Sequence, residues 1–277
     1  MTYQKALKQG EAFLREHGID DAVTDSWLLL AMACRIDRNF YYLHMQKELP
    51  GEQKEVYEAA LKKRAGHIPL QHITGEQEFM GLPFLVNADV LIPRQDTEIL
   101  VEEALKKAKP GMRVLDLCTG SGCIIVSLLK ISPHLLGVAS DLSAAALCVA
   151  KKNAGRNGVS PVFVQGDLFE PVKGTFDLIV SNPPYIPTAE IEKLMPEVRE
   201  HEPLLALDGK EDGLVFYKRI IEEGYPYLKP GGFLMFEIGC DQGKEVSARM
   251  EQAGYQDVKI IKDLAGLDRV VIGGKHV

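Results

Sequence analysis

Asn182, Pro183, Pro184 and Tyr185 are the residues whose types and spacing most directly suggest chemistry. They follow the apolar run 176–181, which reads as a buried strand, and the two prolines end that strand and stiffen the turn. The Asn182 side chain and the free Pro183 carbonyl can accept both hydrogens of a planar –NH2 group, while the Tyr185 ring covers its π face. Ordinary loops also carry such proline pairs, so the turn alone fits either a structural stop or a site for planar amino groups.

A glycine-rich turn earlier in the chain is a candidate ligand site. The expected strand 113–117 runs into this turn, and a helix follows it. Gly120 and Gly122 permit positive φ and a close backbone approach, and the start of the helix supplies free N–H groups. Position 125 is Ile, so the third glycine of a dinucleotide-binding turn is missing. This absence argues against a diphosphate ligand.

Two acidic residues follow the next two expected strands. Asp141 ends the strand 135–141, where a carboxylate can accept hydrogen bonds from both hydroxyls of a ribose. Asp167 follows the strand 161–166, where it is placed for an adenine edge. Either residue alone is more commonly a solvated turn residue. Together with the glycine-rich turn, at successive strand ends, they indicate an adenosine-containing ligand without a diphosphate.

The chain divides into three segments by its hydrophobic pattern. Residues 1–75 are expected to be all-helical, with helices at 3–17, 21–35 and 52–65. Residues 76–92 change to a strand period and predict a β-hairpin connector. From residue 93 onward helices, including 97–107, 143–157 and 213–227, alternate with strands.

This alternation predicts a mainly parallel sheet covered by helices on both faces. The segment between the last two strands, 262–268, is too short for a crossover helix, so these strands should pair antiparallel. The seven expected strands are 113–117, 135–141, 161–166, 176–181, 233–238, 258–261 and 269–272.

The composition narrows the class of protein. The chain has 277 residues, of which 46% are hydrophobic and 26% charged, enough for one or two globular domains. Its net charge of −7 argues against a protein that depends on neutralising nucleic-acid phosphates. The five cysteines have no C-x-x-C spacing, so reduced thiols in a cytoplasmic protein are expected, without a zinc site. Neither a signal peptide nor a membrane span is indicated.

Several stretches resemble a known family. The glycine-rich turn, the two acids and Asn-Pro-Pro-Tyr resemble class I S-adenosylmethionine-dependent methyltransferases that act on planar amino groups. Other segments are similar to the bacterial protein-(glutamine-N5) methyltransferases of peptide-chain release factors, the PrmC/HemK family. Two departures are Gln95, where the family more often has Pro, and Cys118, where it more often has Gly. The similar segments are 69–75, 91–98, 202–203, 206–207, 209, 212–213 and 263–271.

The resemblance implies a fold, a domain plan and a reaction. The fold is α/β, a Rossmann-like class I methyltransferase with a seven-stranded, mostly parallel sheet and an antiparallel last strand. A small all-α domain and a β-hairpin connector precede it. The implied domains are a helical substrate-recognition domain at 1–75, a linker at 76–92 and the methyltransferase domain at 93–277. The implied reaction moves a methyl group from S-adenosyl-L-methionine to the glutamine N5 of the release-factor Gly-Gly-Gln motif, tuning translation termination, and leaves S-adenosyl-L-homocysteine.

The resemblance also implies roles for individual residues. Catalytic roles fall to Asn182, Pro183 and Tyr185. Substrate contacts come from Asn182, Pro183, Pro184 and Tyr185. Cofactor contacts come from Asp116, Cys118, Thr119, Gly120, Ser121, Gly122, Asp141, Asp167, Leu168 and Asn182. No metal ligand is implied, and the roles of Arg94 and Glu98 stay open.

Two other functions fit parts of the pattern. A DNA or RNA adenine-N6 methyltransferase would use the same pocket, because adenine N6 is also a conjugated –NH2, but it would normally carry a basic surface for the nucleic acid. A protein that binds S-adenosylmethionine without catalysis would retain the glycine-rich turn but would not need Asn-Pro-Pro-Tyr. For the preferred function we expect a cytoplasmic monomer whose partners are class I release factors, with no nucleic acid or membrane involved.

Overall fold

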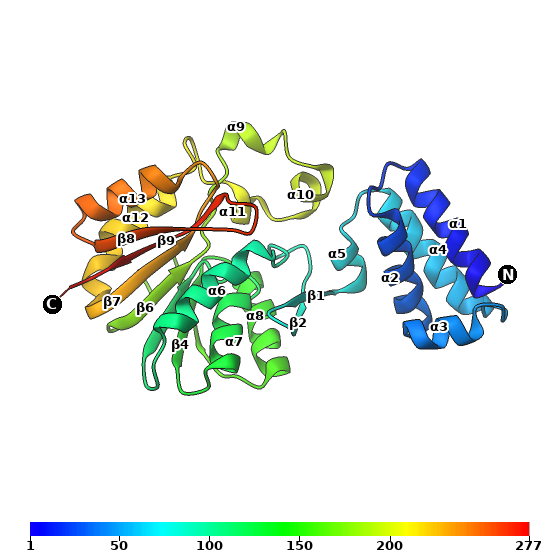
Figure 1. Cartoon of the computed structure of the whole chain (residues 1–277), viewed down its shortest axis with the longest axis horizontal. Coiled ribbons are helices and arrows are strands. Elements are labelled where there is room, and N and C mark those ends of the chain that lie inside the picture. The colour runs from blue at the N-terminus through cyan, green and yellow to red at the C-terminus, as the bar shows by residue number, and fades with distance from the viewer. Residues whose placement is uncertain (277) are drawn as a thin grey trace. The chain divides into compact units, whose positions relative to one another are not determined.

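The computed structural model describes residues 1–276. They form two compact units, which are described separately (Figure 1). One unit contains Met1–Gly75 together with Met195–His201, and the other contains Glu76–Leu194 and the residues from Glu202 onward. Within residues 1–276, no helix has the length and apolar character needed to cross a membrane.

The smaller unit is a helical bundle around its own apolar core. Thr2 caps its first helix by accepting a hydrogen bond from the Lys5 N–H at 3.2 Å. Trp27 packs in this core, as its apolar helix suggests. Arg64 is buried and pairs with Asp25 at 2.6 Å. The helices are α1 (Tyr3–Glu16), α2 (Ala22–Cys34), α3 (Arg38–His44), α4 (Gly51–Ala65) and α5 (Leu70–Thr74), with α10 (Pro196–His201) from later in the chain.

The larger unit is built on a seven-stranded sheet, as predicted. Its strand order is β5-β4-β3-β6-β7-β9-β8. β9 pairs antiparallel with both β7 and β8, and the other neighbouring pairs are parallel. The strands are β3 (Arg113–Leu117), β4 (Leu136–Asp141), β5 (Val162–Gln165), β6 (Phe176–Ser181), β7 (Leu228–Glu237), β8 (Gln256–Lys262) and β9 (Asp268–Gly274).

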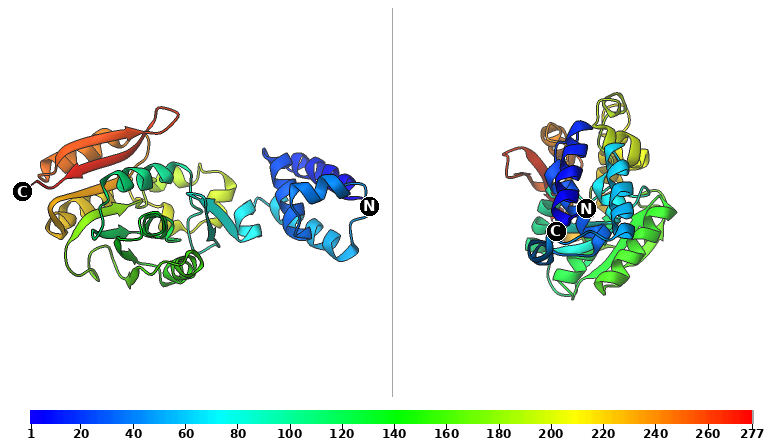
Figure 2. Two further views of the ribbon diagram at one scale, coloured as in Figure 1. Left: turned by 60° about the horizontal axis from the view of Figure 1, so that its bottom comes forward. Right: turned by 90° about the vertical axis from the view of Figure 1, so that its right-hand side faces the viewer.

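Helices cover both faces of this sheet (Figure 2). Alternate strand residues enter different cores, as the two-residue period of a strand requires. Val114 of β3 belongs to the core under one set of helices, and Leu115 to the core under the other. The first set is α6 (Asp96–Lys107), α7 (Cys123–Ile131) and α8 (Ala144–Asn157), and the second is α12 (Val215–Gly224) and α13 (Gly243–Gln252).

The chain reverses its direction of winding between β3 and β6. It runs outward from β3 to β4 and β5, then returns to place β6 on the other side of β3. Leu117 and Ser181, the last residues of these two strands, are partners in the register. Open α/β sheets bind their ligands at such a switch point, beyond the carboxyl ends of the strands. The glycine-rich turn directly follows Leu117, and Asn182 directly follows Ser181, so both lie at this switch point.

A two-stranded hairpin precedes the sheet. It consists of β1 (Glu76–Phe79) and β2 (Leu82–Leu85), which pair antiparallel as the strand pattern predicts. Asn153 of α8 accepts from the Leu85 N–H at 2.7 Å and donates to the Leu85 carbonyl at 3.0 Å. These two bonds satisfy the backbone N–H and carbonyl groups of Leu85 and attach the hairpin to α8.

The observed elements correct several sequence expectations. The expected helix 213–227 is shorter, because α12 ends at Gly224 and Tyr225–Tyr227 is a 3-10 turn containing Pro226. Strand β7 begins five residues before the expected 233. Short helices that the periodicity did not indicate include α3 and, after the Asn-Pro-Pro-Tyr turn, α9 (Thr188–Ile191) and α11 (Leu204–Leu207). Each has too few turns to show a clear 3.6-residue pattern.

Candidate active site

The glycine-rich turn after β3 relies on backbone conformations that few residues adopt. Gly120 has φ 55°, and Gly122 has φ 80° at the N-cap of α7. A Cβ on Gly122 would come within 3.0 Å of the Ala150 Cβ, so this glycine also permits close packing on α8. Cys118 has φ 58°, which explains why glycine suits its position better. The departure at Cys118 therefore affects backbone strain as well as side-chain size.

Asp116 holds the turn from inside the sheet. Its side chain is fully buried, and its Oδ2 accepts from the Thr119 hydroxyl at 2.6 Å. Burial raises the pKa of Asp116 to about 7. The residue does not line the hollow beside the turn. Asp116 is connected to the hollow through Thr119, which lines it.

Asp141 joins the turn to the next helix. One carboxylate oxygen accepts from the Gly120 N–H and the other from the Ser143 N–H, both at 2.8 Å. Burial raises the pKa of Asp141, and these backbone donors oppose the rise. A carboxylate has about four acceptor positions, so both oxygens can still receive ligand hydroxyls.

The end of β5 contributes the second acid. The Asp167 carboxylate accepts from Arg219 of α12 at 3.0 Å. Leu168, with φ 47°, is buried, and its carbonyl accepts from the Ser140 hydroxyl at 3.2 Å. The β4 and β5 ends are therefore joined through side chains and backbone. Arg219 was not among the residues that the sequence pattern indicated.

The end of β6 and the turn after it are joined to β3 and to α6. The Ser181 hydroxyl donates to the Leu117 carbonyl at 2.8 Å, and Pro183 and Pro184 are buried. The Asn182 side-chain nitrogen donates to the Thr97 hydroxyl of α6 at 3.4 Å. These contacts restrict Asn182 at the edge of the sheet.

Two glycines give the Tyr185 backbone room. A Cβ on Gly209 would approach the Tyr185 backbone to 2.8 Å, and one on Gly213 would approach the Tyr185 carbonyl to 2.3 Å. That carbonyl accepts from the Gln242 side chain at 3.0 Å. The Tyr185 ring packs against the core beneath α12 and α13. Burial raises the pKa of Tyr185 to about 12, so its hydroxyl is protonated at neutral pH.

A hollow of about 1010 Å³, including its open mouth, lies beside these turns. Most of the predicted site residues line it, whereas Asp116, Gly122, Pro183 and Tyr185 do not. The predicted residues that line it are Cys118, Thr119, Gly120, Ser121, Asp141, Asp167, Leu168, Asn182 and Pro184. Lining residues that the sequence did not identify as site residues include Thr97, Leu142, Ala206 and Phe216.

Arg94 and Glu98 have different surroundings. Arg94 lines the hollow and pairs at 2.6 Å with Glu202, whose side chain is buried. This ion pair connects the segment before α6 with the segment before α11. Glu98 instead accepts from the Met80 N–H at 2.6 Å and holds the β1–β2 hairpin. Gln95, the other departure from the family, is exposed.

The donor set of the hollow fits S-adenosyl-L-methionine. The open face of Gly120 has no atom within 4 Å of an added Cβ, so the backbone there is accessible. Carboxylates at the β4 and β5 ends suit the ribose and the adenine, and apolar side chains such as Leu142 and Phe216 can cover the base. Within residues 1–276, no group of three or more His, Cys, Asp or Glu side chains is arranged to hold a metal ion.

Comparisons with known proteins agree with this geometry. Residues 5–75 match the PrmC N-terminal domain, and residues 94–198 match the methyltransferase small domain. A release factor glutamine methyltransferase of Geobacter sulfurreducens is 45% identical over 98% of this chain and 96% of its own length. One of Clostridium acetobutylicum is 40% identical over 98% of each chain. A Pyrococcus furiosus methyltransferase structure, 22% identical, has a TM-score of 0.54 over 72% of this chain and 91% of its own.

The sheet, the glycine-rich turn and the strand-end acids define a class I methyltransferase that uses S-adenosyl-L-methionine. The 45% identity with the Geobacter sulfurreducens protein, over nearly the whole chain, identifies the family within this class. The chain belongs to the release factor glutamine methyltransferase family, as the sequence resemblance indicated.

Proposed function

We propose that this enzyme methylates the side-chain nitrogen N5 of the glutamine in the Gly-Gly-Gln motif of class I peptide-chain release factors. The observation that carries the proposal is Asn182 in the wall of the cofactor hollow, directly after the strand that pairs with β3. A glutamine side chain presents the planar –NH2 group for which two acceptors at this turn are suited. The names of the full-length relatives support a release factor as the protein that carries this glutamine.

The chemistry depends mainly on orientation. When bound, S-adenosyl-L-methionine would supply an electrophilic methyl group and leave as S-adenosyl-L-homocysteine when the methyl–sulfur bond breaks. The methylated nitrogen releases one of its two protons to water after the transfer. The Asn182 side-chain oxygen and the Pro183 carbonyl accept the two amide hydrogens and direct the nitrogen lone pair toward that methyl group. Such positioning can contribute about 7–11 kcal/mol to lowering a barrier. These acceptors also stabilise positive charge that develops on the nitrogen.

Tyr185 and the two prolines give the turn its rigidity. Pro183 and Pro184 are buried, and the Tyr185 backbone is fixed by Gln242. We propose that the Tyr185 ring packs against the glutamine side chain and excludes water. A site with two acceptors rejects a carboxylate, which offers no hydrogens, so a Gln→Glu substrate should lose activity by up to about 10⁴-fold.

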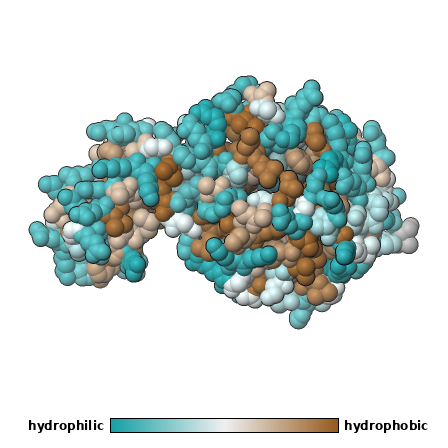
Figure 3. Space-filling model, turned by 180° about the vertical axis from the view of Figure 1, so that it is seen from behind, coloured by the Kyte–Doolittle hydropathy of each residue, from teal (hydrophilic) through white to brown (hydrophobic). Residues whose placement is uncertain are grey.

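We further propose that the helical unit binds the release factor. Its helix α3 exposes Phe40, Tyr42 and Leu43, the last with 80% of its surface accessible. Figure 3 also shows hydrophobic side chains gathered in a broken band on one face of the larger unit. Large exposed apolar side chains gathered in this way are typical of surfaces that bind protein partners. On this proposal the enzyme acts as a cytoplasmic monomer and needs neither nucleic acid nor a membrane.

Methyl transfer to a purified class I release factor tests this function. The enzyme is incubated with labelled S-adenosyl-L-methionine and the release factor, either wild type or with the Gly-Gly-Gln glutamine changed to glutamate. Peptide mass analysis should find one added methyl group on the glutamine of the wild-type factor and none on the variant. Methylation at another residue, or none at all with cofactor binding intact, would contradict the proposal.

A further inference from the structure

Glu237 is a buried acid beside the Asn-Pro-Pro-Tyr turn at 182–185. The proposed reaction, as described above, assigns no role to this acid. Glu237 is the last residue of β7, and only 2% of its surface is accessible. In the parallel register of β6 and β7, Ser181 is opposite Phe236. The next residues along the two strands, Asn182 and Glu237, are therefore neighbours. Glu237 does not line the hollow, whereas Asn182 does.

The contacts of Glu237 connect it with the inner side of Asn182. The Thr97 and Asn182 side chains lie close enough to the Glu237 carboxyl group to lower its pKa. The Asn182 side-chain nitrogen also donates to the Thr97 hydroxyl at 3.4 Å. One Glu237 oxygen, Oε2, has no hydrogen-bond partner in the described part of the chain. The carboxyl group is thus a strong acceptor behind Asn182, with spare capacity.

This arrangement bears on which end of the Asn182 carboxamide faces the hollow. An asparagine side chain can turn over with little change in shape, and its surroundings decide between the two orientations. A carboxylate can only accept, so it attracts the –NH2 end. The carbonyl oxygen then points away from Glu237, toward the hollow. A protonated carboxyl group can donate instead and allows the opposite orientation.

We propose that Glu237 is the positioning residue for Asn182: its carboxylate accepts from the Asn182 –NH2 group and so directs the Asn182 oxygen toward the substrate nitrogen. This inference rests on the proposed function for its consequence in catalysis. The orientation itself is a property of the enzyme alone. On this proposal the Thr97 hydroxyl accepts a hydrogen bond from the Asn182 –NH2 group and donates one to Glu237.

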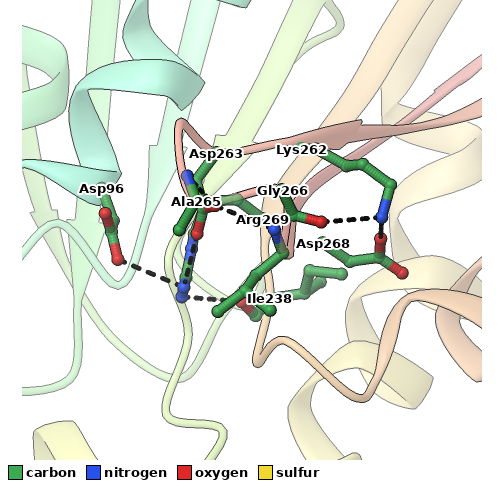
Figure 4. Close-up of polar contacts among 9 residues, drawn as sticks. Asp96, Ile238, Lys262, Asp263, Ala265, Gly266, Asp268 and Arg269 are labelled. Atoms are coloured by element: carbon green, nitrogen blue, oxygen red, sulfur yellow. Dashed lines mark hydrogen bonds and ion pairs between the residues drawn. The ribbon is translucent and has the colours of Figure 1, made fainter.

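The charges around Glu237 determine when it is a carboxylate. Burial raises the pKa of Glu237 to about 7. The Asp96 carboxylate of α6 contributes to this rise, whereas the Thr97 side chain and the Arg269 guanidinium of β9 oppose it. Figure 4 shows Arg269 between Asp96 at 3.2 Å and Asp263 at 3.1 Å. The other titratable groups that interact with Glu237 are Tyr185, Tyr217 and Cys123.

Arg269 is held in place by groups near Glu237. Its guanidinium donates to the carbonyl of Ile238, the residue after Glu237, at 3.4 Å (Figure 4). The Tyr217 hydroxyl donates to the Glu237 backbone carbonyl at 2.9 Å. The end of β7 is therefore fixed from both β9 and α12, which limits how far Glu237 can move when it changes protonation state.

Nuclear magnetic resonance of the side-chain amides tests the orientation without any turnover. The chain has five asparagines, so selective nitrogen-15 labelling gives few signals, and Asn182→Ala identifies the one from Asn182. We expect this signal to shift with a midpoint near pH 7 in the wild type, and the shift to be absent in Glu237→Gln. The control Glu245→Gln, at an exposed position on α13, should titrate like the wild type.

A second acid with a pKa near 7, Asp116, requires its own control. The Asn182 signal of Asp116→Asn should still titrate if Glu237 is responsible. Should Glu237→Gln fail to fold, the wild type and Asp116→Asn decide the question together. A midpoint near 7 in both supports the proposal. No titration in the wild type, loss of the titration in Asp116→Asn, or its persistence in Glu237→Gln would overturn it.

Kinetics with the release factor provide a second measurement. Glu237→Gln should lower kcat by about 10–100-fold at pH values above 7, the range expected for losing one hydrogen bond to a charged group. The KM for the cofactor should change little, because Glu237 does not line the hollow. The acid limb of kcat/KM near pH 7 should disappear in this variant. An unaltered kcat and acid limb would overturn the proposal, whereas an inactive wild type would instead contradict the proposed function.

Discussion

The two sides of the hollow are built in different ways. On the cofactor side, backbone groups do most of the positioning: Asp141 is fixed by the N–H groups of Gly120 and Ser143. On the acceptor side, side chains from distant segments take this role, since Asn182 donates to Thr97 of α6 and lies beside Glu237 of β7. Backbone donors are fixed by the fold, but a carboxamide between side chains can turn over. We therefore expect substitutions on the cofactor side to change affinity and those on the acceptor side to change rate.

The sharpest test of this division is Asn182→Ala. It removes an acceptor that acts on the developing charge, so kcat for release-factor methylation should fall by about 100–1000-fold. The Kd for S-adenosyl-L-methionine should change far less, as measured by calorimetry. Gln252→Ala, at an exposed position at the end of α13, is the control. A near wild-type kcat in a folded Asn182→Ala enzyme would show that Asn182 has no role in the reaction.

The opposite result is expected for Asp141→Asn. A ribose hydroxyl loses a charged acceptor, so the Kd for S-adenosyl-L-methionine should rise by about 10–100-fold. At saturating cofactor, kcat should stay within a few-fold of the wild type, as steady-state kinetics can show. Asp20→Asn, at an exposed position in the helical unit, is the control. A large fall in kcat with unchanged affinity would contradict the division between the two sides.

The same comparison can be sharpened at Cys118, whose φ of 58° is unusual for a residue with a side chain. Cys118→Val places a β-branched residue in this conformation and should lower the free energy of unfolding by about 1–3 kcal/mol. Cys118→Gly suits the backbone and should stay within about 1 kcal/mol of the wild type. Denaturant unfolding measures both. Equal stability of the two variants would show that the backbone of this turn relaxes.

The last prediction concerns Asp116 and pH. Its folded-state pKa of about 7 lies above the ordinary value, so the folded protein retains a proton that the unfolded chain has already released. Wild-type stability should therefore fall as pH rises through the interval between the two values. Asp116→Asn lacks this loss, so its stability relative to the wild type should increase between about pH 4 and about pH 7.

Urea unfolding at several pH values measures this difference. Asp20→Asn, at an exposed position in the helical unit, should show no comparable trend. A constant difference between Asp116→Asn and the wild type would mean that Asp116 is ionised in the folded protein throughout this range.

The same contrast explains what the sequence could predict. The cofactor side was predictable because its residues stand at successive strand ends, and strand ends follow from hydrophobic periodicity. Asn182 was predictable for the same reason, as it follows the apolar strand 176–181. The residues beside Asn182 could not be predicted in this way. In the sequence, Thr97 resembles any residue at the start of a helix, and Glu237 resembles any acid at the end of an apolar strand. Only the sheet order, with β7 beside β6, brings Glu237 to Asn182.

The region between β6 and β7 was the least predictable. Its helices α9, α10 and α11 are too short for periodicity to reveal. The reason for Gly209 and Gly213 appears only when the Tyr185 backbone is seen against them. These glycines are therefore explained by a long-range contact that no local pattern records.

The most direct test of the account is an experimental structure of the enzyme with S-adenosyl-L-homocysteine and a class I release factor. We predict that the glutamine of the Gly-Gly-Gln motif enters the hollow, with its side-chain nitrogen about 2.7–3.2 Å from both the Asn182 side-chain oxygen and the Pro183 carbonyl. The Asn182 nitrogen should face Thr97 and Glu237. A glutamine held by other residues, or an amide nitrogen that contacts neither acceptor, would contradict the account.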